Sequence, residues 1–95
     1  MDICLGFNTD GTRPSEETIN AVTGLFQVAG YEVAHNRPYG NAIAPFGYRG
    51  HSLMIEVNKR CYLGSDERHI GSGFDRLRQT LVVIYGMLLG TSSNQ

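Results

Sequence analysis

The chain has 95 residues, of which 41% are hydrophobic and 18% charged, so it is long enough for one modest core and is not disordered as a whole. Eight basic and nine acidic residues leave a net charge of −1, which gives no global attraction to nucleic acid or to a membrane surface. The longest apolar run, residues 81–89, falls well short of the roughly 20 residues that a membrane span needs.

The two cysteines, Cys4 and Cys61, lie far apart in the sequence and show no zinc-finger spacing. The segment Met1–Cys4 lacks the basic and long apolar regions of a secretion signal. We therefore expect two reduced, mostly buried thiols in a cytoplasmic protein.

The first half of the chain has the pattern of a strand, a helix and a second strand. Residues 3–7 form a short apolar run, and residues 8–14 are rich in turn formers. Ser15 is a candidate N-cap, and Gly30 is a candidate C′ residue. The apolar positions between them recur at helical spacing: Ile19, Val22, Leu25, Phe26 and Ala29. With residues 31–35 as the next strand, this order predicts a parallel βαβ unit.

The second half predicts a long loop, a strand and a final helix. Residues 36–50 are rich in Gly, Pro, Asn and Tyr, with a short strand expected at residues 42–44. Residues 64–73 have the composition of a turn. The final helix is expected from about Phe74 to about Leu89, and residues 91–95 are expected to fray. Its predicted apolar stripe consists of Phe74, Leu77, Leu81, Ile84 and Leu88, widened by Val82, Tyr85 and Leu89. The fold class is therefore α/β, with a small mostly parallel or mixed sheet and flanking helices.

The segment at residues 51–63 is the most informative part of the chain, because it predicts a buried strand that carries a carboxylate. A period of two places Ile55 and Val57 on one face and Glu56 and Asn58 on the other. A buried charge must be paired or hydrogen-bonded, so Glu56 suggests a catalytic or binding site. A strand-end carboxylate bonded to backbone amides or to Arg60 is the alternative.

If the sheet is parallel, polar residues that follow its strands should meet at one rim, where ligands of open α/β sheets bind. The first strand would bring residues 8–11, the second residues 35–39, and the third Glu56, Asn58 and Arg60. Asn36 could instead be a turn residue, and His35 and His51 could be half-buried without a chemical role. Arg13, Arg37 and Arg49 could be surface charges or anion clamps.

Four blocks of the sequence together resemble the N-formylglutamate amidohydrolase family. Residues 51–63, His-Ser-Leu-Met-Ile-Glu-Val-Asn-Lys-Arg-Cys-Tyr-Leu, resemble its H-[AS]-x-x-I-E-[IV]-N-R-x-L-Y-M block. Residues 30–40 resemble its G-Y-x-V-x-x-N-x-P-[YF]-x-G segment. Residues 2–6 with the Asp-Gly at 10–11 resemble its first strand and turn, and residues 73–77 resemble the start of its last helix. The resemblance covers only the carboxyl-terminal part of the family's longer chains.

The resemblance implies a partial phosphorylase/hydrolase-like fold and an enzyme of histidine breakdown. That enzyme would use zinc to hydrolyse N-formyl-L-glutamate to formate and glutamate. Glu56 matches the family's general base, and Asn36 and Asn58 match polar positions near the substrate. Arg60 lies one position beyond the family's arginine, whose place Lys59 takes. Zinc is implied as the cofactor, but the family's ligand motifs are missing, so we expect no metal site in this chain.

Three hypotheses follow for residues 1–95, treated as a single domain of this type. The first is an amidohydrolase-like enzyme chain that lacks the metal-ligand portion. The second is a non-catalytic module that binds a small acidic metabolite, with no nucleic acid or membrane partner. The third is a structural domain derived from the same family, in which self-association as a homo-oligomer would cover open apolar surface.

Overall fold

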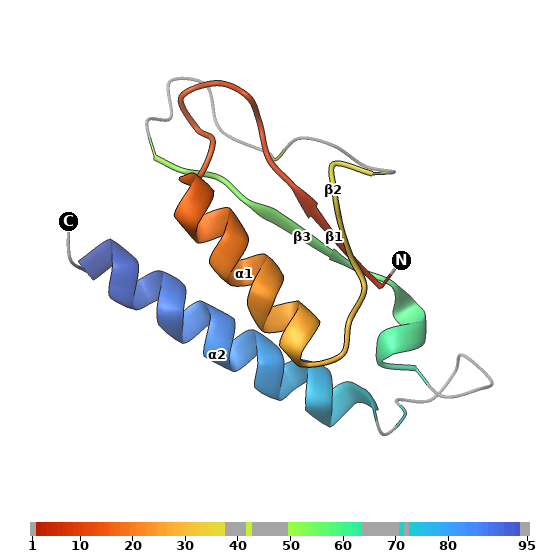
Figure 1. The fold of residues 1–95 in the computed structure, drawn as a ribbon. Coiled ribbons are helices and arrows are strands. Elements are labelled where there is room, and N and C mark those ends of the chain that lie inside the picture. The colour runs from red at the N-terminus through yellow and green to blue at the C-terminus, as the bar shows by residue number, and fades with distance from the viewer. Residues whose placement is uncertain (1, 38–41, 43–49, 64–70, 72, 94–95) are drawn as a thin grey trace. The chain divides into compact units, whose positions relative to one another are not determined.

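The computed structural model describes residues 2–37, 42, 50–63, 71 and 73–93, and it has the expected α/β composition (Figure 1). The chain divides into two compact units, residues 1–58 and residues 59–95. The first unit contains β1 (Ile3–Gly6), α1 (Glu16–Val28), β2 (Val33–His35) and β3 (Met54–Val57). The second contains the 3₁₀-helix η1 (Lys59–Cys61) and α2 (Gly73–Ser93).

The first unit is built on a three-stranded mixed sheet in the order β2-β1-β3. β1 pairs in parallel with β2, from Ile3 opposite Val33 to Leu5 opposite His35. This pairing confirms the parallel arrangement predicted from the strand-helix-strand pattern. β3 pairs with β1 in the antiparallel sense, so Ile3 lies opposite Val57. The central strand β1 is therefore paired along both edges.

The helix α1 begins and ends where the sequence signals predict. Ser15 is its N-cap, and the Ser15 hydroxyl accepts a hydrogen bond from the backbone N–H of Thr18. Glu16 lies in the first turn, where the helix dipole favours a negative charge. After Ala29, Gly30 adopts a φ of 97°, which glycine reaches without the strain of a Cβ atom.

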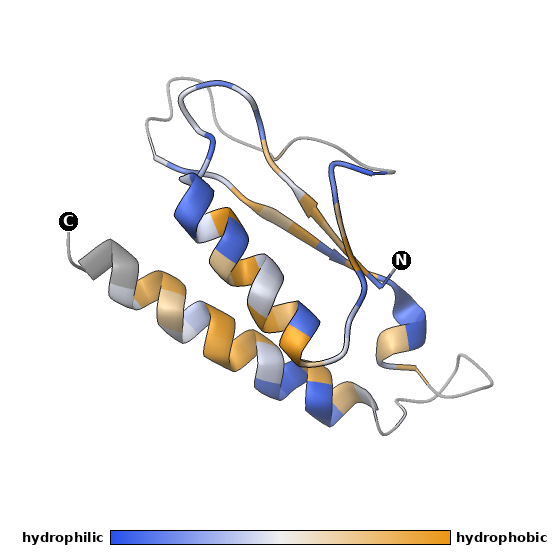
Figure 2. Ribbon diagram, viewed as in Figure 1, coloured by the Kyte–Doolittle hydropathy of each residue, from blue (hydrophilic) through white to orange (hydrophobic). Residues whose placement is uncertain are grey.

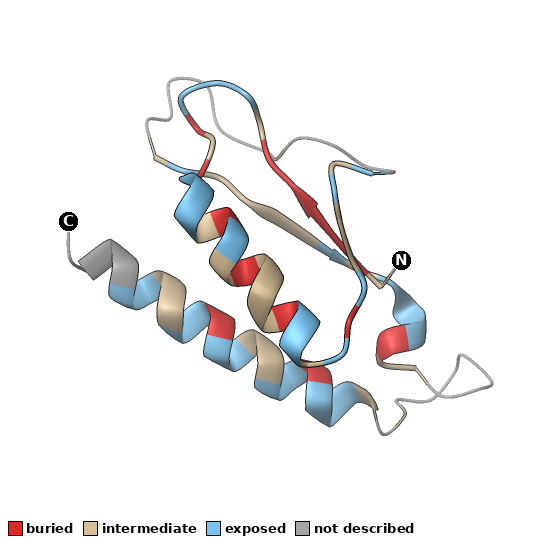
Figure 3. Ribbon diagram, viewed as in Figure 1, coloured by how far each residue is buried: buried red, intermediate tan, exposed pale blue. Residues whose placement is uncertain are grey.

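The core of the first unit joins one side of α1 to the sheet, and α1 lies across one sheet face (Figure 1). Ile19, Val22 and Phe26 form the buried side of the helix, shown in red in Figure 3. Three of the four buried residues of β1 are hydrophobic, namely Ile3, Cys4 and Leu5, and the strand is partly orange in Figure 2. Burying large side chains of this kind contributes roughly 1.5–3 kcal/mol each, which is the main source of the unit's stability.

The strand predicted within residues 51–63 is shorter and less buried than expected. β3 has only four residues, Met54–Val57, and Glu56 in its middle is exposed. The prediction of a buried carboxylate was therefore wrong, because β3 lies at one edge of this sheet. The strand predicted at residues 42–44 lies outside the described residues, except for Ala42. Most of the turn predicted at residues 64–73 lies outside them as well.

The second unit contains η1 and the long helix α2. The carbonyl of Tyr62 accepts a hydrogen bond from Gly71 N at 2.9 Å, and Phe74 N donates to the carbonyl of Gly71 at 3.1 Å. Gly73 opens α2 so close to η1 that an added Cβ atom would lie 2.5 Å from the carbonyl oxygen of Cys61. A glycine is therefore needed for this close approach.

The helix α2 extends beyond the predicted end, because it continues to Ser93 instead of fraying from residue 91. Leu77 and Ile84 of the predicted stripe are buried. Phe74 of the stripe is exposed, and so are the three residues expected to widen the stripe: Val82, Tyr85 and Leu89. Both cysteines are buried and form no disulfide, as expected. No helix of the described residues is long and apolar enough to cross a membrane.

Candidate functional site

The direction of β3 separates residues that the sequence placed at one rim. Asn36 follows β2 and donates its backbone N–H to the carbonyl of Leu5 at 2.8 Å. Asn58 follows β3 and donates its N–H to the carbonyl of Asp2 at 2.8 Å, at the opposite end of the sheet. The expected convergence of the three strand ends was wrong, because it required β3 to be parallel. Arg60 lies in η1, within the second unit.

Glu56 lies on the sheet face turned away from α1. Glu56 pairs with Cys4, and Cys4 pairs with Ala34, so the side chains of these three residues share one face. Side chains alternate along a strand, so the next residue of β2, His35, points to the opposite face, where it contacts Thr23 of α1. The Glu56 carboxylate is therefore exposed on the face that α1 does not cover.

Asn36 holds the ends of β1 and β2 together. Its φ is 54°, in the left-handed region that asparagine tolerates better than most residues. Its side-chain Oδ1 accepts a hydrogen bond from the backbone N–H of Phe7 at 2.9 Å. This bond extends the pairing beyond β1, so the side chain has a structural role. A role for Asn36 in substrate binding stays a prediction.

The loop after β1 is held by its own polar side chains. Oδ1 of Asp10 accepts hydrogen bonds from the hydroxyl of Thr12 at 2.6 Å and from the backbone N–H of Thr12 at 2.9 Å. These bonds, that of the Thr12 hydroxyl first, hold the pKa of Asp10 below its ordinary value of 3.8. Asn8 donates to the Thr12 hydroxyl at 3.0 Å and also exchanges two hydrogen bonds with the backbone of Ala42. The loop is therefore fixed by an Asx-type turn.

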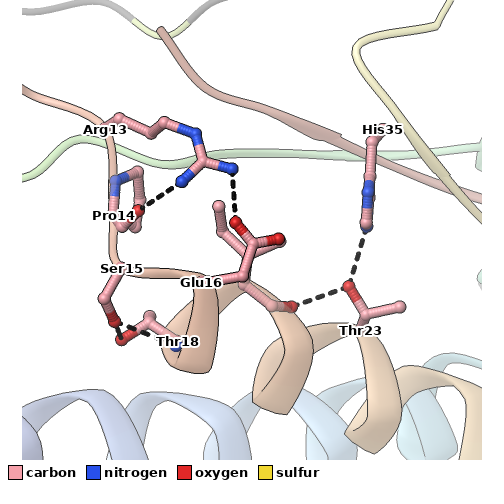
Figure 4. A network of polar contacts seen from close by, with 8 residues as sticks. Arg13, Pro14, Ser15, Glu16, Thr18, Thr23 and His35 are labelled. Atoms are coloured by element: carbon pink, nitrogen blue, oxygen red, sulfur yellow. Dashed lines mark hydrogen bonds and ion pairs between the residues drawn. The ribbon is translucent and has the colours of Figure 1, made fainter. Parts of the chain in front are cut away.

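Arg13 lies between this loop and α1 (Figure 4). Its guanidinium forms an ion pair with Glu16 at 2.7 Å and donates to the carbonyl of Pro14 at 3.3 Å. The same group lies over the ring of Phe7, at 5.2 Å from the ring centroid. An exposed pair of this kind contributes at most about 1 kcal/mol, so Arg13 orders the loop more than it stabilises the fold.

His35 connects the end of β2 to the middle of α1 (Figure 4). Its Nε2 atom lies 2.9 Å from the hydroxyl oxygen of Thr23, and that hydroxyl lies 2.7 Å from the carbonyl oxygen of Ile19. The Thr23 hydroxyl has one proton, which it donates to the carbonyl. It therefore accepts from His35, and Nε2 of His35 carries a hydrogen. The ring also meets the ring of Phe7 edge to face, with centroids 5.7 Å apart.

A recess of about 380 Å³ lies between α1 and β2. It is lined by Thr23, Gln27, Val33, Ala34, His35 and Arg37. The sequence hypotheses gave no role to Thr23 or Gln27, although their spacing of four places them side by side on α1. The three-dimensional packing of α1 against β2 is what brings Thr23 and Gln27 to the same recess as His35.

Metal ligands do not gather in the part of the chain that the structure describes. Among those residues, no group of three or more His, Cys, Asp or Glu side chains could hold a metal ion. A catalytic zinc takes three protein ligands, so the described residues do not fit the zinc that the family resemblance implies.

A crystal structure of N-formylglutamate amidohydrolase from Ralstonia eutropha is similar to this chain, with a TM-score of 0.69 and 30% sequence identity. The two chains have a related fold. The similarity covers 87% of this chain but only 31% of that enzyme, so this chain spans about a third of the enzyme's length. Comparisons with protein-family models and with curated proteins gave no match.

Proposed function

We propose that this chain forms part of an amidohydrolase that cleaves N-formyl-L-glutamate into formate and glutamate. The observation that carries the proposal is the structural match to N-formylglutamate amidohydrolase, at 30% identity over 87% of this chain. The Glu-Val-Asn block at residues 56–58, which resembles the family's motif, lies at the end of β3. The proposed activity is that of the whole enzyme, of whose length this chain spans 31%.

The reaction needs a group that moves a proton. The oxygen of a water molecule bonds to the formyl carbon, the carbon–nitrogen bond breaks, and the leaving amine gains a proton. In the proposal, the Glu56 carboxylate accepts the proton from water and returns it to the amine. Glu56 is exposed, which leaves its carboxylate accessible to a substrate. The zinc of the family would have to be held by residues outside those described, and no step is assigned to it.

The substrate-binding roles of the three polar residues differ in how well they fit this proposal. Asn58 follows Glu56 by two positions and lies near it. Asn36 lies at the far end of a sheet whose longest strands have four residues and are about 13 Å long, so one small ligand cannot reach both asparagines. Arg60 lies in η1 of the second unit, and its role in substrate binding stays a prediction. We therefore place the glutamate part of the substrate nearest to Asn58.

Formate release from N-formyl-L-glutamate tests the proposal, measured with and without added Zn²⁺. We expect Glu56→Gln to lower the rate by about 10²- to 10⁴-fold, the usual contribution of a general base. Glu17→Gln is the matched control, because Glu17 is an exposed glutamate on α1 and should leave the rate unchanged. Equal rates for Glu56→Gln and the parent would exclude the general-base role.

The second candidate function is a non-catalytic module, and the hydrogen bonds of the polar loop residues favour it. Oδ1 of each of Asn8, Asp10 and Asn36 accepts a hydrogen bond from a backbone N–H of the first unit, so all three side chains have structural roles. The same assay separates the two functions. Saturable binding of N-formyl-L-glutamate without formate release, at any zinc concentration, would support the module and contradict the enzyme.

A further inference from the structure

The recess between α1 and β2 has the size and composition of a small-ligand site. Its volume of about 380 Å³ falls within the roughly 300–1,000 Å³ typical of small-molecule pockets. Val33 and Ala34 give it an apolar wall, while Thr23 and Gln27 add polar groups from α1. The recess lies at the β2 edge of the sheet, whereas Glu56 lies on β3 at the opposite edge, so the recess is separate from the proposed catalytic group.

Backbone groups of β2 add donors and acceptors to the recess. The carbonyl of Glu32 accepts a hydrogen bond from Ile3 N, and the N–H of Asn36 bonds to Leu5, so these groups point toward β1. In a parallel pair of strands, every second residue directs its N–H and C=O groups at the paired strand. The N–H and C=O groups of Val33 and His35 therefore point away from β1. In the described part of the chain, β2 is an edge strand, and no strand pairs with that side.

The ionisable groups of the recess are all basic. Among the described residues that line it, His35 and Arg37 are the ionisable ones, and none is a carboxylate. The hydrogen on Nε2 of His35 is already donated to Thr23, so the guanidinium of Arg37 is the charged donor left for a ligand. A guanidinium presents parallel N–H donors that match a carboxylate in a bidentate pair. The recess is therefore complementary to an anion with an apolar or amide-bearing body.

We propose that the recess between α1 and β2 binds a small free carboxylic acid, with its carboxylate against the guanidinium of Arg37. The apolar stem of the ligand lies along Val33 and Ala34. The Gln27 side chain and the outward N–H of His35 or Val33 hydrogen-bond its second polar end. The site does not depend on the hydrolysis proposed for Glu56, because the recess lies at the β2 edge of the sheet and Glu56 lies on β3, at the other edge.

A titration of the ¹⁵N-labelled chain with succinate, followed by amide chemical shifts at constant ionic strength, tests this site. We expect saturable shifts at Val33 and His35, and none with the neutral analogue succinamide. Arg37→Gln should weaken succinate binding by at least about tenfold, the effect of losing a charge-assisted hydrogen bond. Because Arg37 is exposed, this variant should keep the parent's spectrum elsewhere, which shows that it remains folded.

Arg13→Gln is the matched control, because Arg13 is an arginine of the same unit that does not line the recess. It should bind succinate as the parent does. Absence of saturable shifts would overturn the proposal, and so would equal weakening by Arg13→Gln and Arg37→Gln. Inorganic phosphate is the third probe, and phosphate binding as tight as that of succinate would overturn the assignment to a carboxylate.

Discussion

Replacing Asn36 should test whether this residue supports the sheet or serves only a ligand. Asn36→Gly keeps the freedom to adopt a φ of 54° but removes the oxygen that accepts from Phe7 N at 2.9 Å. Phe7 is only 8% exposed, so its N–H would lose a partner in a mostly buried place. That loss costs about 1–3 kcal/mol. Asn36→Ala adds left-handed backbone strain, and its total cost should be about 2–4 kcal/mol.

Urea denaturation of the three variants Asn36→Ala, Asn36→Gly and Asn36→Asp measures these differences as free energies of unfolding. Asn36→Asp is the control, since it keeps an oxygen acceptor and also tolerates the left-handed region, and it should stay within about 0.5 kcal/mol of the parent. The expected order of stability is Asp, then Gly, then Ala. If Asn36→Ala unfolds at the same urea concentration as the parent, the hydrogen bond to Phe7 does not stabilise the sheet and the reasoning is wrong.

Two further predictions concern backbone packing and acid stability. Gly73→Ala should lower the thermal unfolding temperature, because the added Cβ atom would lie 2.5 Å from the backbone oxygen of Cys61. Gly86→Ala is the control: its Cβ atom would meet nothing within 4 Å, so this variant should raise the free energy of unfolding by up to about 1 kcal/mol. An unchanged unfolding temperature for Gly73→Ala would refute the close contact. Asp10 should stabilise the fold above its ordinary pKa of 3.8 and lose that contribution as the pH falls through its lower folded pKa. Unfolding followed from pH 6 to pH 2 should therefore show a shallower acid decline for Asp10→Asn, and parallel curves would contradict the lowered pKa.

Local signals in the sequence predicted the helix of the first unit well. Ser15 and Gly30 mark its ends through capping chemistry, which depends only on neighbouring residues. Ile19, Val22 and Phe26 are buried as their spacing predicts, because one side of a helix faces the sheet. The parallel pairing of β1 and β2 followed from the same local order.

The direction of β3 could not be predicted in the same way. A period of two is identical in parallel and antiparallel strands, and the direction of Met54–Val57 depends on the connection before it, most of which lies outside the described residues. The predicted meeting of polar residues at one rim of the sheet required β3 to be parallel to β1. This is why Asn36 and Asn58 were expected together but lie at opposite ends of the sheet.

The outer side of α2 could not be predicted from its pattern either. Val82, Tyr85 and Leu89 continue the apolar arc of Leu77 and Ile84, but hydropathy does not tell which part of a wide arc is covered. The self-association that would cover such residues stays a prediction, as do the acidic metabolite partner and the cytoplasmic location.

The central position of β1 has a consequence for how the chain folds during synthesis. β1 leaves the ribosome before either of its neighbours, and the residues opposite it are 33–35 on one edge and 54–57 on the other. Until residue 57 has emerged, a nascent chain exposes a hydrophobic strand with one unsatisfied edge. Ribosome-bound intermediates that stop between the second and third strands should therefore be the species most dependent on chaperones.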